Sequence, residues 1–354
     1  MSTWEENVRK VIPYTPGEQP NQPDMIKLNT NENPYPPAPG VEKALKEMDM
    51  DAMRLYPDPA AYDLVHAIAQ MYSLKDEQVF VGVGSDDVLA MSFLTFFNSE
   101  KPVLFPDITY SFYDVWADLF KIPYERPALD ENFHIKKEDY FRENGGVIFP
   151  NPNAPTGVEM QLEDVEEIIR HNQDVIVIVD EAYVDFGGKS ALPLIEKYDN
   201  LLVVQTFSKS RSLAGMRIGF AIGSKTLISV LEAVKNSYNS YTVDALSIAM
   251  GIASVEDDTY FKSTVAKIIA TRTRVTQELR ALGFEVIDSQ TNFIMATHPD
   301  LCIRDLFEYL KSKKVFIRYF NLPRIDNYTR ITIGTDDEMD IFLNEVKNYL
   351  GDKK

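Results

Sequence analysis

The chain has 354 residues, of which 45% are hydrophobic and 25% are charged, the proportions of a packed globular protein. Its net charge of −18 repels phosphates and therefore disfavours nucleic acid and anionic membranes as partners. No stretch approaches the ~18 apolar residues that span a bilayer, and the N-terminus lacks the apolar core of a signal peptide. Cys302 is the only cysteine, so no intrachain disulfide can form, which fits a cytoplasmic protein. The four histidines are scattered, so we expect no metal site.

Three parts follow one another along the chain. Residues 1–28 form a polar arm, residues 29–258 a large domain and residues 259–354 a smaller α+β domain. In the large domain, short β-branched runs alternate with amphipathic segments, which predicts an α/β fold around a mainly parallel sheet. Its expected strands are Val79–Val83, Pro102–Phe105, Gly146–Phe149, Val175–Val179, Leu201–Thr206 and Ile218–Ile222. Its expected helices are Asp86–Phe97, Tyr110–Leu119 and Leu162–His171.

The smaller domain is expected to begin with a long helix, roughly Thr259–Leu282. Short elements follow it, among them a helix over Cys302–Lys313 and a closing helix at the C-terminus. The expected strands are Phe284–Ile287, Asn292–Ala296, Val315–Arg318 and Arg330–Ile333.

Unusual residues gather where the expected strands end, which is where open α/β sheets bind ligands. Gly84-Ser85-Asp86 opens a helix, whose free backbone N–H groups suit a phosphate, although a plain strand–helix turn has the same sequence pattern. Asp180 ends a buried strand, where a cofactor, a helix cap or a salt bridge would offset its burial. Lys209 stands between two serines at another strand end, with Arg217 eight residues on, although most lysines are simply solvated.

Together these residues meet the requirements of one cofactor, pyridoxal phosphate. A lysine amine can bind the cofactor aldehyde covalently. An aspartate beside the pyridine nitrogen keeps the ring protonated and able to accept electrons. Tyr183 could hydrogen-bond the ring hydroxyl, while a helix N-terminus, hydroxyl groups and Arg217 would neutralise the phosphate.

The same segments resemble the pyridoxal-phosphate-dependent aminotransferases of fold type I. The resemblance covers nearly the whole chain and rests on Asn153-Ala154-Pro155-Thr156-Gly157, Asp180-Glu181-Ala182-Tyr183, Thr206-Phe207-Ser208-Lys209 and Arg217. It implies the large domain and smaller C-terminal domain of that fold, with Lys209 as the covalent cofactor ligand and Asp180 as the pyridinium partner. The other cofactor contacts that it implies are Ser85, Asp86, Tyr110, Asn153, Tyr183, Thr206, Ser208 and Arg217.

Two of these positions leave alternatives open. The family has an asparagine directly before Pro-Thr-Gly, but this chain has Ala154 there and Asn153 one step earlier. Either Asn153 still reaches the ring hydroxyl from an irregular loop, or Tyr183 serves alone. A cis peptide before Pro155 would fit such a loop. Tyr110 would stack on the cofactor ring, or it is an aromatic residue of the core.

Within this superfamily the chain resembles the histidinol-phosphate aminotransferases. The shared segments are Leu28–Pro34, Arg54–Asp58, Ser289–Phe293 and Thr329–Gly334. The resemblance implies transfer of the amino group of L-histidinol phosphate to 2-oxoglutarate, giving imidazole-acetol phosphate and L-glutamate in histidine biosynthesis.

This reaction requires a site that accepts a phosphate in one half and a carboxylate in the other. A guanidinium fork binds either anion, so Arg330 and Arg318 are the candidates, although Arg318 could equally be a solvated strand end. The other residues expected on the substrate side are Tyr14, Glu32, Asn33 and Asn292. In this family Tyr56 would reach the partner subunit's cofactor phosphate, which implies a homodimer.

Three other functions remain open. An aminotransferase for aromatic amino acids shares every cofactor motif, and a lyase of the threonine-phosphate decarboxylase type also resembles this sequence along most of its length. A non-catalytic protein that holds a nucleotide at Gly84-Ser85-Asp86 is the third, but it leaves Lys209, Asp180 and Arg217 without a role.

Overall fold

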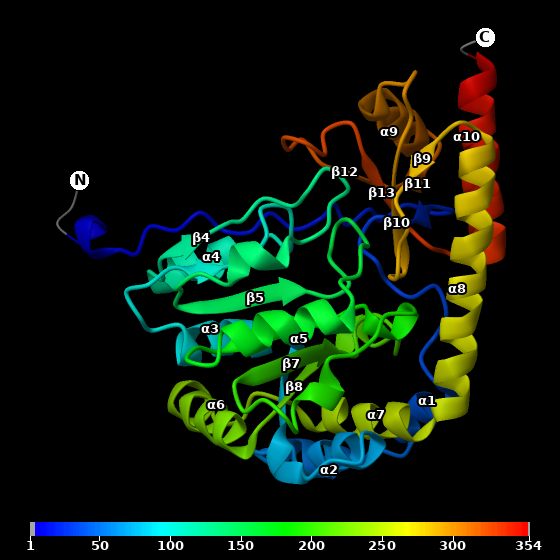
Figure 1. Cartoon of the computed structure of the whole chain (residues 1–354). Helices are drawn as coiled ribbons and strands as arrows, with labels where there is room; N and C mark the ends of the chain where they lie inside the picture. The colour runs from blue at the N-terminus through cyan, green and yellow to red at the C-terminus, as the bar shows by residue number, and fades with distance from the viewer. Residues whose placement is uncertain (1–3, 353–354) are drawn as a thin grey trace.

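The computed structural model describes residues 4–352 and contains a seven-stranded sheet (Figure 1). The strand order is β2 (Val79–Val83), β8 (Ile218–Gly223), β7 (Leu201–Thr206), β6 (Val177–Asp180), β5 (Gly146–Pro150), β3 (Val103–Leu104) and β4 (Tyr124–Glu125). Strand β8 runs antiparallel to both neighbours, and the other pairs are parallel. The predicted α/β fold with a mainly parallel sheet is therefore confirmed.

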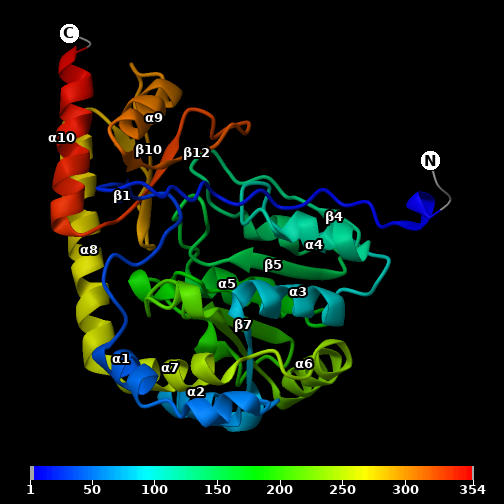
Figure 2. The same ribbon diagram turned by 180° about the vertical axis from the view of Figure 1, so that it is seen from behind.

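Helices cover both faces of this sheet, which is why its strands are apolar throughout. One face packs against α2 (Tyr62–Met71), α5 (Leu162–His171) and α7 (Ala245–Glu256), and the other against α3 (Gly84–Phe96), α4 (Tyr113–Phe120) and α6 (Lys225–Tyr238). Successive residues of a strand point to opposite faces, so Val147 belongs to one core and Ile148 to the other. Helix α1 (Pro39–Lys46) packs on α7. Figures 1 and 2 show α5 and α3 on opposite sides.

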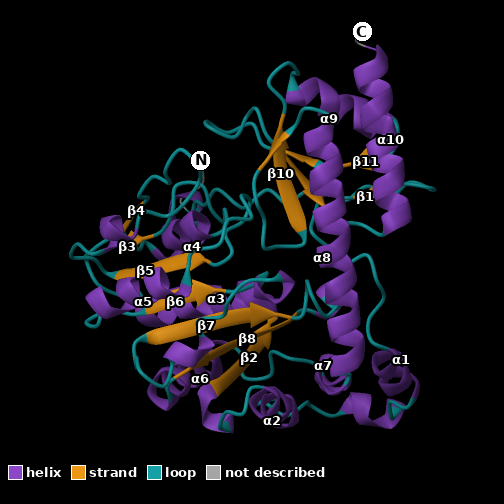
Figure 3. Ribbon diagram, turned by 45° about the vertical axis from the view of Figure 1, so that its right-hand side comes forward, coloured by secondary structure: helices purple, strands orange, loops and turns teal. Residues whose placement is uncertain are grey.

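A second, four-stranded sheet lies toward the C-terminal end of the chain (Figure 3). Its order is β12 (Arg318–Tyr319), β13 (Thr329–Thr332), β10 (Phe293–Thr297) and β9 (Glu285–Val286), all antiparallel. Its apolar residues form one core with α8 (Asp258–Ala281), α9 (Ile303–Ser312) and α10 (Asp336–Asp352). The predicted strand Val315–Arg318 is divided, because β11 (Val315–Phe316) pairs with β1 (Ile26–Lys27) and not with this sheet.

The N-terminal arm runs in an extended path past α4 toward the small sheet (Figure 2). Strand β1 and the following residue attach it there, since the backbone N–H of Leu28 donates to the Phe316 carbonyl at 2.7 Å. Helix α8 begins beside α7 and extends to the small sheet, so the predicted boundary after residue 258 coincides with the start of a helix shared by both parts (Figure 1). The division into domains stays a prediction.

Short 3-10 turns complete the secondary structure: η1 (Glu5–Asn7), η2 (Met50–Arg54), η3 (Asp76–Gln78), η4 (Lys137–Tyr140), η5 (Val184–Phe186), η6 (Leu192–Leu194) and η7 (Ala214–Met216). Of the helices in residues 4–352, none has the length and apolar character needed to cross a membrane.

Candidate active site

The ends of β2, β6, β7 and β8 meet at one cavity of about 250 Å³. The cofactor residues predicted from sequence that line it are Ser85, Asp86, Tyr110, Asp180, Tyr183, Thr206, Ser208, Lys209 and Arg217. These residues are separated by up to 132 positions in the sequence, because Ser85 follows the first strand of the sheet and Arg217 precedes the last. The topology of the sheet therefore brings these residues, which are far apart in the sequence, into one cavity.

One end of the cavity is suited to a phosphate. Helix α3 begins at Gly84, whose φ of +81° favours glycine, and its first backbone N–H groups carry the positive end of the helix dipole. Arg217 lies across this end and reaches Asp86 Oδ2 at 3.2 Å. The hydroxyls of Thr206 and Ser208 lie 3.0 Å apart beside it. Donors from three strand ends thus surround one small volume.

Gly219 explains how β8 can approach this helix so closely. A Cβ atom at residue 219 would lie 2.2 Å from the backbone nitrogen of Ser85, a distance that no side chain allows. We therefore expect that Gly219→Ala would displace the start of α3 and weaken anion binding there.

Asp180 lies at the carboxyl end of β6 and is 4% exposed. Tyr113 donates its hydroxyl to Oδ2 at 2.8 Å, and the Ala182 backbone N–H donates to Oδ1 at 3.2 Å. Burial raises the pKa of Asp180 to about 6, although both hydrogen bonds favour the charged form. A buried carboxylate that makes no ion pair with any described residue fits a cationic ring nitrogen. Tyr113 was not predicted to take part, since its sequence context shows only an amphipathic helix.

Lys209 extends from the end of β7 into the cavity. Its Nζ lies 3.4 Å from the Thr30 carbonyl and 5.7 Å from the centroid of the Tyr183 ring. Asn33 donates to the backbone carbonyls of Lys209 and Ser210 at 3.0 and 3.1 Å. Asn33 therefore braces the main chain that carries Lys209, and it is absent from the lining of the two cavities around this lysine.

The two tyrosines of the cavity are held by hydrogen bonds. Tyr110 donates to Asp86 Oδ1 at 2.6 Å, and the Asn31 side chain donates to the Tyr183 hydroxyl at 2.9 Å. Burial and the charge of Asp86 raise the pKa of Tyr110, so this hydroxyl stays protonated. Tyr110 thus lines the cavity, although its ring also contacts the aromatic residues of α4.

Asn153 lies outside the cavity lining, whereas Ala154 takes part in it. The Asn153 amide donates to the Ile108 carbonyl and to Thr156 Oγ1, both at 3.0 Å, and accepts from Thr109 Oγ1 at 3.1 Å. Its polar atoms therefore hold the surrounding loops together. The Ala154–Pro155 peptide is cis. A contact between Asn153 and a cofactor ring would require these hydrogen bonds to break.

A larger cavity of about 730 Å³ adjoins the first and shares Lys209, Tyr183 and Tyr110 with it. The predicted substrate residues Tyr14, Arg318 and Arg330 line it, and the N-terminal arm forms part of its wall. Glu32 lines the smaller cavity instead, where its carboxylate pairs with Lys27 and accepts from Thr30. Tyr14 stacks on Phe112 with ring centroids 4.1 Å apart.

Two arginines stand side by side in this cavity. Arg318 and Arg330 are directly opposite each other on the antiparallel strands β12 and β13, where like charges repel. Arg330 donates to the Asn29 carbonyl at 2.9 Å, but its Nε is buried without a hydrogen-bond partner. Burial lowers the pKa of Arg330, and the Arg318 charge adds to this effect. Neither arginine pairs with a described carboxylate, so the pair fits an anionic ligand.

Asn292 immediately precedes β10 and is fully buried. Its side-chain nitrogen donates to the Asn31 carbonyl at 2.9 Å, while its Oδ1 has no partner among the described residues. It is absent from the lining of both cavities, so the structure gives it a role in holding the segment of Asn31.

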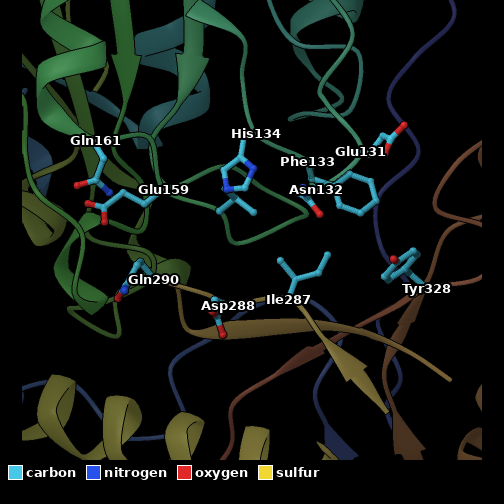
Figure 4. A pocket seen from close by; sticks show the side chains of 11 residues that line it. Glu131, Asn132, Phe133, His134, Glu159, Gln161, Ile287, Asp288, Gln290 and Tyr328 are labelled. Carbon is cyan, nitrogen blue, oxygen red and sulfur yellow. The ribbon is translucent and has the colours of Figure 1, made fainter. Parts of the chain in front are cut away.

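A third cavity, of about 420 Å³, contains none of the predicted site residues (Figure 4). Its side chains come from the loops around His134 and Glu159 and from residues 287–290 and Tyr328 near the small sheet. Three of its lining residues are acidic, and it contains neither lysine nor arginine. A phosphorylated substrate would be repelled there, which leaves the site at Lys209 as the candidate for anion chemistry.

Comparison with known proteins decides the family. Residues 23–346 match the family model described as aminotransferase class I and II. The chain belongs to this aminotransferase family. It is 52% identical over 352 residues to a histidinol-phosphate aminotransferase of Lactococcus lactis subsp. cremoris, with 99% of both chains covered. A histidinol-phosphate aminotransferase of Clostridium beijerinckii is 48% identical over 351 residues, covering 99% of this chain and 98% of that one.

Solved structures show that the aminotransferase has the expected fold. The crystal structure of the histidinol-phosphate aminotransferase from Clostridium acetobutylicum matches with a TM-score of 0.86 at 22% identity, covering 93% of this chain and 100% of that one. The enzyme from Sinorhizobium meliloti in complex with pyridoxal-5'-phosphate gives 0.82 at 24% identity, with 90% and 89% covered. An L-threonine-O-3-phosphate decarboxylase from Porphyromonas gingivalis gives 0.80 at 21% identity, with 92% and 100% covered. The fold alone therefore does not separate these reactions.

Glu181, the residue after Asp180, is fully buried in the aminotransferase and has no predicted role. Its carboxylate accepts from Ser190 Oγ at 2.7 Å, from the Ala191 backbone N–H at 2.6 Å and from Gln205 Nε2 at 2.9 Å. Burial nevertheless raises its pKa from 4.5 to about 7. Between pH 4.5 and about pH 7 the folded chain keeps a proton on Glu181 that the unfolded chain has lost, so the free energy of unfolding falls as the pH rises.

We expect Glu181→Gln to remove this part of the pH dependence. Relative to the parent, the variant should gain about 3 kcal/mol in free energy of unfolding between pH 4.5 and about pH 8. Urea unfolding of the cofactor-free protein at a series of pH values measures the difference. Asp180 titrates in both proteins and cancels in this comparison. A difference that does not change with pH would contradict the assigned pKa shift.

Proposed function

We propose that the chain is a pyridoxal-phosphate-dependent histidinol-phosphate aminotransferase. It would transfer the amino group of L-histidinol phosphate to 2-oxoglutarate, giving imidazole-acetol phosphate and L-glutamate in histidine biosynthesis. One observation carries this proposal above all: a cavity built around Lys209 and Asp180 opens onto two unpaired arginines on adjacent strands. The first part suits the cofactor, and the second suits the anionic group of each substrate.

The residues around Lys209 fit the cofactor group by group. Asp180 would hold the ring nitrogen, and Tyr183 would bond the ring hydroxyl, since both line the same cavity as Lys209. The start of α3, Thr206, Ser208 and Arg217 would hold the phosphate. When bound, the cofactor supplies an aldehyde for the amine and a ring that withdraws electrons from the substrate carbon.

The chain itself supplies proton transfer and orientation. Lys209, once its amine is free, would take the proton from the substrate carbon that bears the amino group and deliver it to the cofactor carbon on the other side of that nitrogen. Asp180 would stabilise a positive charge on the ring nitrogen of the bound cofactor. Tyr14 and the arm beside it line the larger cavity, where they would limit the access of water to a bound substrate.

Arg330 and Arg318 would bind the phosphate of histidinol phosphate in one half-reaction and a carboxylate of 2-oxoglutarate in the other. A guanidinium presents two parallel donors that match either anion. Binding would also relieve the repulsion between the two cross-strand charges and satisfy the buried Nε of Arg330. The bound anion would therefore supply the negative charge and the hydrogen-bond acceptor that the two arginines lack in the free site.

The enzyme would act as a homodimer, with Tyr56 at the partner subunit's cofactor phosphate. Tyr56 is 82% exposed and lies outside the cavities of its own chain. Before it in the sequence, Met50 and Leu55 are exposed by 74% and 58%, and Tyr238, three residues before its stacking partner Tyr241, is exposed by 77%. An exposed apolar surface of this kind supports a protein interface. The cytoplasm is the compartment that the single cysteine favours.

An absorbance spectrum tests the proposed reaction directly. The purified yellow protein should lose its long-wavelength band on addition of L-histidinol phosphate without a keto acid, and 2-oxoglutarate should restore it. A spectrum that does not respond to histidinol phosphate would remove this substrate but keep the cofactor. A response to phenylalanine would then indicate an aromatic aminotransferase, and carbon dioxide release from threonine phosphate would indicate the lyase.

A further inference from the structure

Lys235 is a lysine buried in the large part of the molecule. It lies on α6 and is 2% exposed, although lysine side chains are almost always solvated. Its Nζ pairs with Glu232 Oε2 at 2.8 Å on the same helix and donates to the Pro59 carbonyl at 2.6 Å. These two partners offset the cost of burying the ammonium. One of them is the main chain of the loop that follows Tyr56.

This loop, residues 57–61, is a tightly hydrogen-bonded turn. Asp58 accepts from the backbone N–H groups of Ala60 at 3.0 Å and Tyr62 at 2.9 Å, and its carbonyl accepts from Ala61 at 3.0 Å. Pro57 and Pro59 restrict φ at two of the five positions. The turn is therefore rigid in itself, and Lys235 attaches it to α6.

The ring of Tyr56 is held although its side chain is exposed. It stacks on Tyr241, just after α6, with centroids 4.6 Å apart. Its hydroxyl makes no hydrogen bond with a residue of the described chain 4–352 and is exposed, so it is free to bind a group from outside this subunit. Two contacts, one on the main chain and one on the ring, thus fix a side chain that has no ligand of its own.

We propose that Lys235 is a positioning residue that acts across the dimer. By holding the 57–61 turn, it presents Tyr56 to the cofactor phosphate of the partner subunit. This inference rests on the proposed dimer and on the proposed contact of Tyr56. A tyrosine that is ordered before binding loses less side-chain entropy when the phosphate arrives, so loss of the clamp weakens cofactor binding in the other subunit.

Hybrid dimers with one working cofactor lysine separate this role from a purely structural one. In both hybrids one chain carries Lys209→Ala, so covalent binding and activity report on the single Lys209 of the other chain. In the first hybrid Lys235→Met is on the chain that keeps Lys209. In the second it is on the chain that carries Lys209→Ala, which is the chain that donates Tyr56 to the working site.

The second hybrid should bind pyridoxal phosphate about tenfold more weakly than a hybrid with Lys209→Ala alone, as titrated by the yellow absorbance band. The first hybrid should bind it as the reference does. The opposite pattern would overturn the proposal, because Lys235 would then act within its own subunit. Equal weakening in both hybrids would also overturn it, since it would show a general loss of stability.

Matched variants complete the test. Lys225→Met removes a lysine of the same helix that is 69% exposed and pairs with Glu77, and it should leave both hybrids unchanged. Tyr56→Phe should weaken cofactor binding when it lies on the chain that carries Lys209→Ala. Adding Lys235→Met to that same chain should weaken cofactor binding no further. If Tyr56→Phe acts across the dimer and Lys235→Met does not, the inference fails alone. If Tyr56→Phe has no effect, the proposed contact and the inference fail together.

A substitution in the turn covers the case in which Lys235→Met does not fold. Pro59→Gly removes the restriction on φ at the residue that Lys235 holds and leaves α6 intact. It should weaken cofactor binding when it lies on the Lys209→Ala chain and leave it unchanged when it lies on the other. Weakening that follows the chain with the working lysine would reject the positioning role.

Discussion

Lys209→Ala is expected to abolish the transfer reaction, with a loss in kcat of at least ~10³-fold. In the proposed mechanism the substitution would remove both the covalent attachment of the cofactor and the base that moves the proton. The remaining contacts of the cavity, from Asp180, Tyr183 and the phosphate end, should still hold the cofactor without a covalent bond. The yellow absorbance band and single-turnover rates with histidinol phosphate measure the two losses separately.

A control is needed because a lysine in a cavity can also affect folding. Lys225→Ala, on the surface of α6, should keep full activity and the same unfolding midpoint as the parent. Small primary amines added to the Lys209→Ala protein should restore part of the rate, since they can enter the cavity and accept the proton. Substantial turnover by Lys209→Ala without added amine would remove this lysine from the reaction.

Sequence periodicity predicts the layered fold well, because apolar runs and helical spacing are local patterns that can be read within a few neighbouring residues. The buried strands Val79–Val83 and Leu201–Thr206 and the helix Leu162–His171 have the predicted bounds. The expected helix from Tyr110 starts instead at Tyr113, because Tyr110 turns toward Asp86 at the cavity. Strand β1 escaped prediction, since two residues in an arm carry no periodicity.

The site is predictable as a set of residues but not as a set of contacts. Strand-end residues such as Asp180 and Lys209 converge because the topology of a parallel sheet requires it. Which of several polar residues in a loop faces the cavity depends on hydrogen bonds between distant segments. Asn33 and Asn153 resemble ligand residues in sequence, yet each bonds to the main chain of a neighbouring loop. Tyr113 looks like a core aromatic, yet it orients Asp180.

Arg330→Ala should reduce kcat/KM for histidinol phosphate by about 10²-fold, since a charge-assisted hydrogen bond contributes ~1.5–3 kcal/mol. The loss should fall mainly on KM, because the phosphate is bound in the ground state as well as in the transition state. Arg330→Lys keeps the charge but loses the two parallel donors of the guanidinium, so its kcat/KM should lie between those of the parent and of Arg330→Ala. Steady-state kinetics in each half-reaction measure these effects.

The same substitution should leave cofactor binding and folding nearly unchanged. Removing the Arg330 guanidinium costs its hydrogen bond to the Asn29 carbonyl, but it also removes a buried Nε without a partner and a like charge opposite Arg318, so we expect the net loss in the unliganded protein to be small. We therefore expect the cofactor dissociation constant to change by less than about twofold while substrate affinity falls. Equal losses of cofactor and substrate affinity would show that Arg330 supports the fold. A loss confined to substrate affinity would show that Arg330 serves the bound anion. The repulsion between Arg330 and Arg318 would then persist in the free protein because only that anion neutralises it.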